Sequence, residues 1–136
     1  MIKKILLIVI LLTFAVSCGK KADPEYKESK YKYINQNNSD SMDHILAKTI
    51  SGLSDYVREI LPDLLIVHGD RVEALAGASI GALNNILTGH IEGGEVSGTI
   101  DDSIRHATTK FAHLHFTSNN DATNRIIKMG ENPKNV

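Results

Sequence analysis

Apolar and polar residues divide the chain into three parts. Residues 5–16 are almost all apolar and follow two lysines, whereas residues 19–40 are polar and show no spacing that would bury one face of a helix or strand. From residue 43 onward, apolar residues recur at helical spacing or in short strand-like runs. We therefore expect one folded region, residues 41–136, preceded by two segments of a different kind.

The folded region shows alternating helix and strand patterns. An amphipathic helix that ends before Pro62 and packs on a sheet is predicted by apolar residues at helical spacing, namely Ile45, Leu46, Ile50, Leu53, Val57, Ile60 and Leu61. We expect strands at 64–68, 86–91 and 114–117, helices at 72–84, 101–112 and 121–129, and a glycine-rich loop at 93–98. This alternation predicts an α/β fold with a partial doubly wound parallel sheet.

Two glycines lie four residues apart in the helix expected at residues 72–84. Gly77 and Gly81 have the spacing that pairs helices in membranes, but the segment is too short to cross a bilayer and contains Glu73. We therefore expect these glycines to let the helix pack closely on the sheet.

Residues 1–18 resemble a lipoprotein signal peptide. Lys3 and Lys4 precede the apolar run, and Ser17 and Cys18 follow it at a small-residue cleavage site. Cleavage there would leave the thiol of Cys18, the only cysteine, free for lipidation and membrane anchoring. The alternative is that residues 3–10 form a first strand of a parallel sheet. Residues 19–40 are expected to be a flexible linker.

The net charge is close to zero, with 15 lysine and arginine residues against 16 acidic residues, which argues against nucleic acid as a partner. The distribution is uneven. Residues 1–34 contain seven lysines and three acidic residues, whereas residues 35–136 contain eight basic and thirteen acidic residues. This difference indicates two segments of different origin.

Three short polar runs carry the candidate chemistry. They are residues 67–71, 90–95 and 100–106, and each combines acidic residues with a histidine or arginine at an expected strand end or helix start. In an open α/β sheet, these positions present side chains to a ligand. These three runs therefore contain the candidate functional residues.

The same runs resemble one enzyme family. The matching segments are PDLLIVHGDRVEALAGA (62–78), HIEGGEVSGTID (90–101), RHA (105–107) and MGE (129–131). Together they are similar to the hydrolysing UDP-N-acetylglucosamine 2-epimerases, in particular the branch that feeds sialic and legionaminic acid synthesis. The resemblance covers roughly residues 40–136, and it implies the Rossmann-like half of a GT-B-type epimerase fold.

The resemblance implies a reaction and roles for the site residues. In this family a carboxylate removes the proton at C2 of the sugar while UDP leaves C1; water then adds at C1, and a proton returns to the opposite face of C2. Inversion at C2 needs acid and base groups on both faces, and the resemblance assigns them to Asp70, Glu92 and Asp102. Substrate binding and orientation are assigned to His68, Arg71, Glu95, Arg105 and His106.

Each carboxylate also has a structural explanation. Asp70 with Glu73, and Thr99 with Asp102, have the spacing of helix capping pairs. Asp102 also departs from the family, which usually has the longer Glu there, and the shorter side chain would misplace the carboxylate. Glu92 would be costly to bury without a purpose. The two glycines that follow it are expected to let the backbone approach a ligand closely.

Four histidines (His90, His106, His113 and His115) raise the question of a metal site. His113 and His115 would share one face of a strand. No cysteine accompanies them and their spacing is not that of a zinc site, so we expect neither a metal nor a cofactor.

Two functions remain open. The first is a hydrolysing UDP-N-acetylglucosamine 2-epimerase domain that is truncated and inactive alone, because the family's Gly-x-Arg loop and second, UDP-binding domain are not in this sequence. Such a chain would self-associate or need a chain that supplies the missing domain. The second is a surface lipoprotein whose α/β module binds a sugar or a partner without catalysis. The signal peptide indicates a membrane-anchored protein, whereas UDP-amino-sugars are cytoplasmic substrates.

Overall fold

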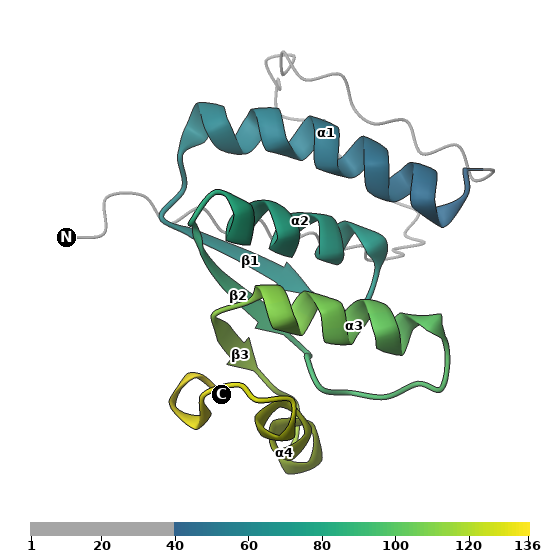
Figure 1. Cartoon of the computed structure of the whole chain (residues 1–136), viewed down its shortest axis with the longest axis vertical. Helices are drawn as coiled ribbons and strands as arrows, with labels where there is room; N and C mark the ends of the chain where they lie inside the picture. Colours follow the sequence, from purple (N-terminus) through teal and green to yellow (C-terminus); the bar gives the residue numbers. More distant parts are fainter. Residues whose placement is uncertain (1–39) are drawn as a thin grey trace, which may run out of the picture.

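The computed structural model describes residues 40–136 (Figure 1). The expected signal peptide, its Cys18 and the expected linker up to residue 39 lie outside this range, so they stay predictions. Strands and helices alternate along the described chain, in the order α1 (Met42–Ile60), β1 (Leu64–His68), α2 (Val72–Leu83), β2 (Leu87–Ile91), α3 (Ile100–Phe111), β3 (Leu114–Phe116), α4 (Asn120–Lys128) and η1 (Pro133–Asn135).

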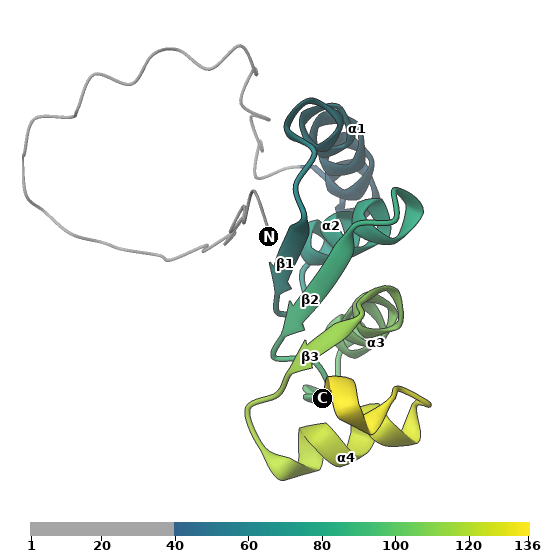
Figure 2. The same ribbon diagram turned by 90° about the vertical axis from the view of Figure 1, so that its left-hand side faces the viewer.

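The three strands form one parallel sheet in the order β1-β2-β3. Ile66 pairs with Gly89, and Gly89 pairs with Leu114, so neighbouring strands end at the same edge of the sheet. Helices α1, α2 and α3 form one layer on a single face of this sheet, and α4 lies beyond β3 (Figure 2). The predicted α/β class with a parallel sheet is confirmed.

The core lies between the helix layer and the sheet. Leu65 and Val67 of β1 pack against Val57 of α1 and Ala78 of α2. Gly77 and Gly81 make this approach possible. A Cβ on Gly77 would lie 2.7 Å from Val67 Cγ1, and one on Gly81 would lie 2.1 Å from Thr88 Oγ1. The prediction of close helix-to-sheet packing through the two glycines is confirmed.

Helix α1 lies beside α2 and reaches the core through Leu53 and Val57 (Figure 1). Val57 belongs to the same core cluster as Leu65 and Val67 of β1, so the expected packing of α1 toward the sheet is confirmed. Only Thr49 and Val57 are buried along its 19 residues, because the narrow contact with α2 leaves most of its surface in solvent. None of the helices within residues 40–136 is long and apolar enough to cross a membrane.

The second face of the sheet carries no helix from the described part of the chain (Figure 2). Apolar side chains on it remain accessible: Leu87 is 44% exposed and Phe116 is 51% exposed. Gly89 lies between Phe116 and Ile66, since a Cβ at this position would lie 3.1 Å from Phe116 and 3.7 Å from Ile66. We call this surface the open sheet face. Parallel sheets are normally covered on both faces.

Candidate active site

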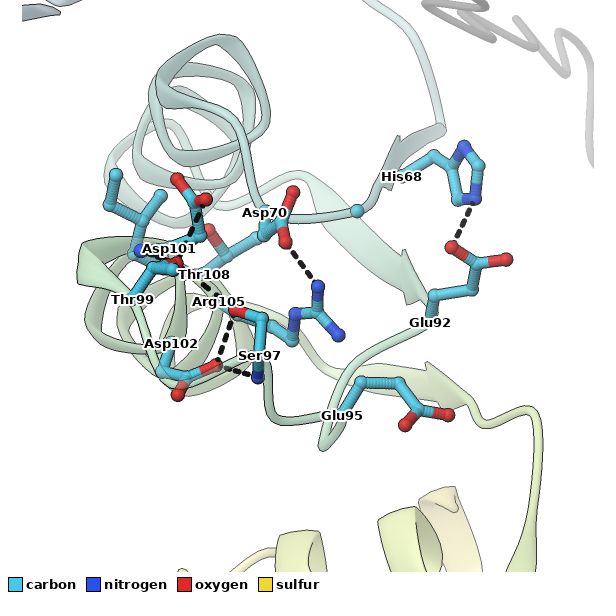
Figure 3. A network of polar contacts seen from close by, with 12 residues as sticks. His68, Asp70, Glu92, Glu95, Ser97, Thr99, Asp101, Asp102, Arg105 and Thr108 are labelled. Atoms are coloured by element: carbon cyan, nitrogen blue, oxygen red, sulfur yellow. Dashed lines mark hydrogen bonds and ion pairs between the residues drawn. The ribbon is translucent and has the colours of Figure 1, made fainter.

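The carboxyl ends of the strands bring most of the candidate residues together (Figure 3). His68 is the last residue of β1, Glu92 follows the last residue of β2, and the loop after Glu92 leads into α3. Because all strands are parallel, these segments meet at one edge of the sheet. The edge therefore holds Asp70, Glu92 and Arg105 within one small region.

Glu92 has an unusual backbone. Its φ of 62° lies in the left-handed region that residues other than glycine rarely adopt. Its N–H donates to the carbonyl of Phe116 at 2.9 Å, and its Oε2 lies 2.9 Å from Nε2 of His68. Such strained positions cluster at functional sites. The carboxylate is thus held at the end of β2 by His68. The Glu92 side chain is 53% exposed, so the expectation that it is buried is wrong.

Asp70 is paired with a residue of α3. Its Oδ2 accepts a hydrogen bond from Nη2 of Arg105, whose side chain is only 11% exposed. The alternative that Asp70 caps α2 is wrong, because the N-cap residue is Arg71, which is exposed and makes no side-chain capping bond. Asp70 therefore lies inside the strand-end site, and Arg71 stands at its rim.

Asp102 is engaged by its own loop. Oδ1 accepts from the N–H of Ser97 at 2.6 Å and from its hydroxyl at 3.0 Å, while Oδ2 accepts from the N–H of Gly98 at 2.8 Å. These backbone bonds lower the pKa of Asp102. Thr99 is the N-cap of α3, as the cap-like explanation expected, but its side chain accepts from the N–H of Asp101. Asp102 bonds Ser97 and Gly98 instead of Thr99, so only the Thr99 part of the predicted capping pair is confirmed. In Figure 3, Asp102 is turned toward Ser97, on the opposite side of the view from Glu92.

The neighbouring Asp101 is placed differently. Its Oδ2 accepts from the Thr99 hydroxyl at 3.0 Å, whereas its Oδ1 takes part in none of the hydrogen bonds found among residues 40–136. The sequence pattern alone could not separate the two adjacent aspartates. The difference arises from their positions in the first turn of α3, where only Asp102 reaches back over the loop.

Glu95 lies on the far side of the loop, beside α4. Its Oε1 accepts from the hydroxyl of Ser118 and, at 2.7 Å, from Nδ2 of Asn119. Asn119 also caps α4 by accepting from the N–H of Ala122 at 2.9 Å. The sequence analysis did not identify Ser118 and Asn119 as partners of Glu95. Polar residues just before the helix predicted at 121–129 did, however, indicate a helix cap there.

The glycines after Glu92 allow close packing within the protein. A Cβ on Gly94 would lie 2.5 Å from the carbonyl oxygen of Ala122, and Gly94 has a φ of 81°. Arg125 donates to the Gly94 carbonyl. A Cβ on Gly93 would lie 2.9 Å from Nδ1 of His90. The two glycines thus allow a close approach to the protein's own side chains and to α4, which the sequence could not indicate. The expected approach of this backbone to a ligand stays a prediction.

The histidines do not assemble into a metal site. Among residues 40–136 there is no group of three or more histidine, cysteine, aspartate or glutamate side chains that could hold a metal ion. His113 precedes β3 and accepts from the N–H of Thr88 at 3.2 Å, whereas His115 is buried within β3. His106 of α3 has a buried Nε2 without a hydrogen-bond partner in the described structure.

Comparison with known proteins gives consistent matches. The family described as UDP-N-acetylglucosamine 2-epimerase matches residues 22–136. The chain is 45% identical over 117 residues to the UDP-N-acetylglucosamine 2-epimerase of Neisseria meningitidis serogroup B, covering 86% of this chain and 31% of that protein. It is 38% identical over 120 residues to the GDP/UDP-N,N'-diacetylbacillosamine 2-epimerase (hydrolyzing) of Campylobacter jejuni, with the same shares covered.

The fold has close relatives among solved structures. The crystal structure of UDP-GlcNAc 2-epimerase from Neisseria meningitidis bound to UDP-GlcNAc superposes with a TM-score of 0.69 at 24% identity, covering 75% of this chain and 29% of that chain. This likeness shows that the described residues adopt part of the GT-B-type fold. The chain spans less than a third of the length of the relatives it matches.

The family match begins earlier than expected. It starts at residue 22, whereas the segments recognised in the sequence begin near residue 40. It therefore includes most of the segment expected to be a linker, which lies outside the described residues.

Proposed function

Because the chain belongs to the UDP-N-acetylglucosamine 2-epimerase family, we propose that its strand-end carboxylates form the acid–base half of a hydrolysing 2-epimerase site for a UDP-amino-sugar. The observation that carries the proposal is the pairing of Asp70 with Arg105 and of Glu92 with His68 at one sheet edge. Two carboxylates with separate partners, supported from different loops, can serve the two faces of a sugar ring.

The reaction needs two proton transfers. One carboxylate takes the C2 proton as the C1–O bond breaks and its electron pair leaves with UDP, which gives a 2-acetamidoglucal. Water then adds at C1, and a second acid returns a proton to the opposite face of C2. We assign these roles to Glu92 and Asp70, while His68 and Arg105 hold them in place and balance their charge. Arg71, Glu95 and His106 are proposed to contribute to substrate binding around the same edge.

The hydrolysing outcome is supported by the names of two relatives. The proteins of Campylobacter jejuni and Legionella pneumophila, at 38% and 35% identity, are both described as hydrolyzing 2-epimerases. Release of a free 2-epimerised sugar and UDP, rather than a UDP-sugar, is therefore our proposed outcome for this chain.

The third acidic role has two candidates. The sequence assigns it to Asp102, and this stays a prediction. Both Asp102 oxygens are engaged by Ser97 and Gly98, so Asp102 would have to release the loop before it could serve the sugar. Asp101, with one oxygen outside the hydrogen bonds of the described residues, needs no such change. We include Asp101 beside Asp102 for this reason.

The UDP-binding contacts are proposed to come from outside residues 40–136. The family resemblance places them in a second domain, and binding energy from remote substrate groups is what positions the reacting carbons. Such positioning can contribute roughly 7–11 kcal/mol of the barrier. We therefore propose that residues 40–136 alone do not turn over UDP-N-acetylglucosamine, and that they act with UDP-binding contacts supplied from elsewhere.

A chimera tests the proposal. The matched residues of the Neisseria meningitidis serogroup B relative are replaced by the corresponding residues of this chain, and NMR follows release of UDP and N-acetylmannosamine from UDP-N-acetylglucosamine. We expect turnover that is lost in Glu92→Gln. A folded chimera without activity, or one indifferent to Glu92→Gln, contradicts the proposal.

Export and lipidation at Cys18 form a separate proposal that rests on the sequence alone. Cells fed labelled palmitate should label the wild-type chain and not Cys18→Ala. Equal labelling of the two proteins would overturn it.

Self-association through the open sheet face is also proposed, since Leu87 and Phe116 leave apolar surface in solvent. Sedimentation of the chain as a monomer at all concentrations would contradict it, whereas Phe116→Lys should shift an assembled chain toward monomer.

A further inference from the structure

We propose that His90 and Thr109 form a buried positioning pair that holds the Asp70 loop and the Glu92 loop against α3. The meaning of this pair for catalysis rests on the proposed function, but its structural part can be tested without turnover. His90 is thus a positioning residue and does not itself contact the substrate.

His90 links three elements through its ring. It lies in β2, is fully buried, and has Nε2 2.8 Å from the carbonyl oxygen of Gly69 and Nδ1 3.1 Å from Oγ1 of Thr109 in α3. A carbonyl oxygen only accepts, so Nε2 must carry the proton. In a neutral ring Nδ1 then accepts from the Thr109 hydroxyl. One tautomer therefore satisfies both bonds. The Gly69 carbonyl determines it, and the Thr109 hydroxyl, which can donate or accept, adapts to it.

The Asp70 loop is fixed through Gly69. Gly69 has a φ of 79° and directly precedes Asp70. Its N–H donates to the carbonyl of Ile91 at 3.0 Å, and its carbonyl accepts from His90. The backbone N–H and the carbonyl of Gly69 are thus both hydrogen-bonded to residues of β2. This sets where the chain turns and where Asp70 meets Arg105.

The Glu92 loop packs against the same pair through Gly93. A Cβ on Gly93 would lie 2.9 Å from Nδ1 of His90 and 3.0 Å from Oγ1 of Thr109. Gly93 directly follows Glu92, so the position of the glutamate backbone depends on the volume that the pair occupies. The two carboxylate loops therefore share one support.

Burial keeps the pair neutral. It lowers the pKa of His90 to about 4, with Arg105, His68 and His115 adding like charge around the ring. An apolar side chain could fill the same space, but it could not bond Gly69 and Thr109 at once. A buried polar pair whose bonds are all made specifies one arrangement of its neighbours.

Side-chain ¹⁵N NMR on the full 136-residue chain tests the tautomer. We expect His90 to carry its proton on Nε2 and to show no titration between pH 8 and pH 5.5. A proton on Nδ1, or titration near its ordinary value of 6.5, would overturn the proposal.

Matched variants test the positioning. His90→Leu should shift the amide resonances of Gly69, Asp70 and Glu92 while those of the core residue Ala78 stay in place. His90→Gln keeps an N–H donor near the position of Nε2 and should restore the Gly69 and Asp70 resonances. Shifts spread evenly through the core, or no rescue by Gln, would contradict the positioning role.

Thr109 gives a second route if His90→Leu does not fold. Thr109→Val removes the hydroxyl at nearly constant volume, and Thr109→Ser retains it. We expect Val, and not Ser, to shift the Gly93 resonance. Identical spectra for the two variants would overturn the proposal. If the NMR results are as expected here but the chimera is inactive, the proposed function fails and the positioning role of the pair stands.

Discussion

The carboxylates that follow the strands and the carboxylate at the start of α3 are used in different ways. Asp70 and Glu92 each meet a single side chain, Arg105 and His68, drawn from another element. Asp102 instead accepts three hydrogen bonds from its own loop. Carboxylates thus pair with distant side chains in one place and hold a local loop in the other.

Chain geometry explains the difference. A residue just beyond a parallel strand leaves the sheet and has few backbone donors within reach, so a ligand or a distant side chain must satisfy it. A residue in the first turn of a helix faces the unsatisfied N–H groups that precede the helix. Position within the element therefore matters more for a carboxylate's role than its place in a motif.

The largest effect is expected at Asp70. In the chimera, Asp70→Asn should lower kcat by roughly 10²–10⁴-fold, the range typical of acid–base groups. Asp121→Asn, in the first turn of α4 and outside the strand-end loops, is the control and should leave kcat unchanged. Equal kcat values for the two variants would show that the strand-end carboxylate Asp70 is not an acid–base group of the reaction.

The second effect concerns the pH dependence of stability that arises from the buried His90. The folded pKa of His90 is about 4 against an ordinary 6.5, so in mild acid the unfolded chain binds the extra proton. The free energy of unfolding should thus be complete above pH 6.5 and fall as the pH drops toward 4, by on the order of 3 kcal/mol. Burial also lowers the pKa of His115, which adds a loss of the same sign.

Denaturant unfolding of the full chain at pH 7.5 and pH 5 measures this loss. His90→Gln should flatten the pH dependence more than His115→Gln. If the free energy of unfolding of His90→Gln falls with pH as much as that of the wild type, the stability of the folded chain does not depend on a neutral His90.

The smallest effect is expected at the start of α3. Asp102→Asn cannot accept at both side-chain positions, so it should lose a bond to Ser97 or Gly98 and lower the free energy of unfolding only slightly. Asp101→Asn should leave stability nearly unchanged, because only the Thr99 bond is affected. In the chimera, Asp101→Asn should reduce kcat more than Asp102→Asn. The reverse order of activities would make Asp102 the third acidic residue, as the sequence predicts.

The sequence was sufficient for the elements and insufficient for their partners. Apolar spacing placed the α-helices and strands within about a residue but not the short helix η1, and Gly77 and Gly81 indicated the close packing of α2. The Asp70–Arg105 pair joins residues 35 apart in the sequence, which no local pattern can indicate. The role of Gly94 likewise depends on Ala122, whose position is set only once α4 has folded.

The transfer of the C2 proton tests the central claim most directly. The chimera is supplied with UDP-N-acetylglucosamine in D₂O, and NMR detects deuterium at C2 of the N-acetylmannosamine formed. If Glu92 and Asp70 are the acid–base groups, the product carries deuterium at C2, and both Glu92→Gln and Asp70→Asn stop its formation. Product that retains protium at C2, or deuterated product formed equally well by both variants, would contradict the account.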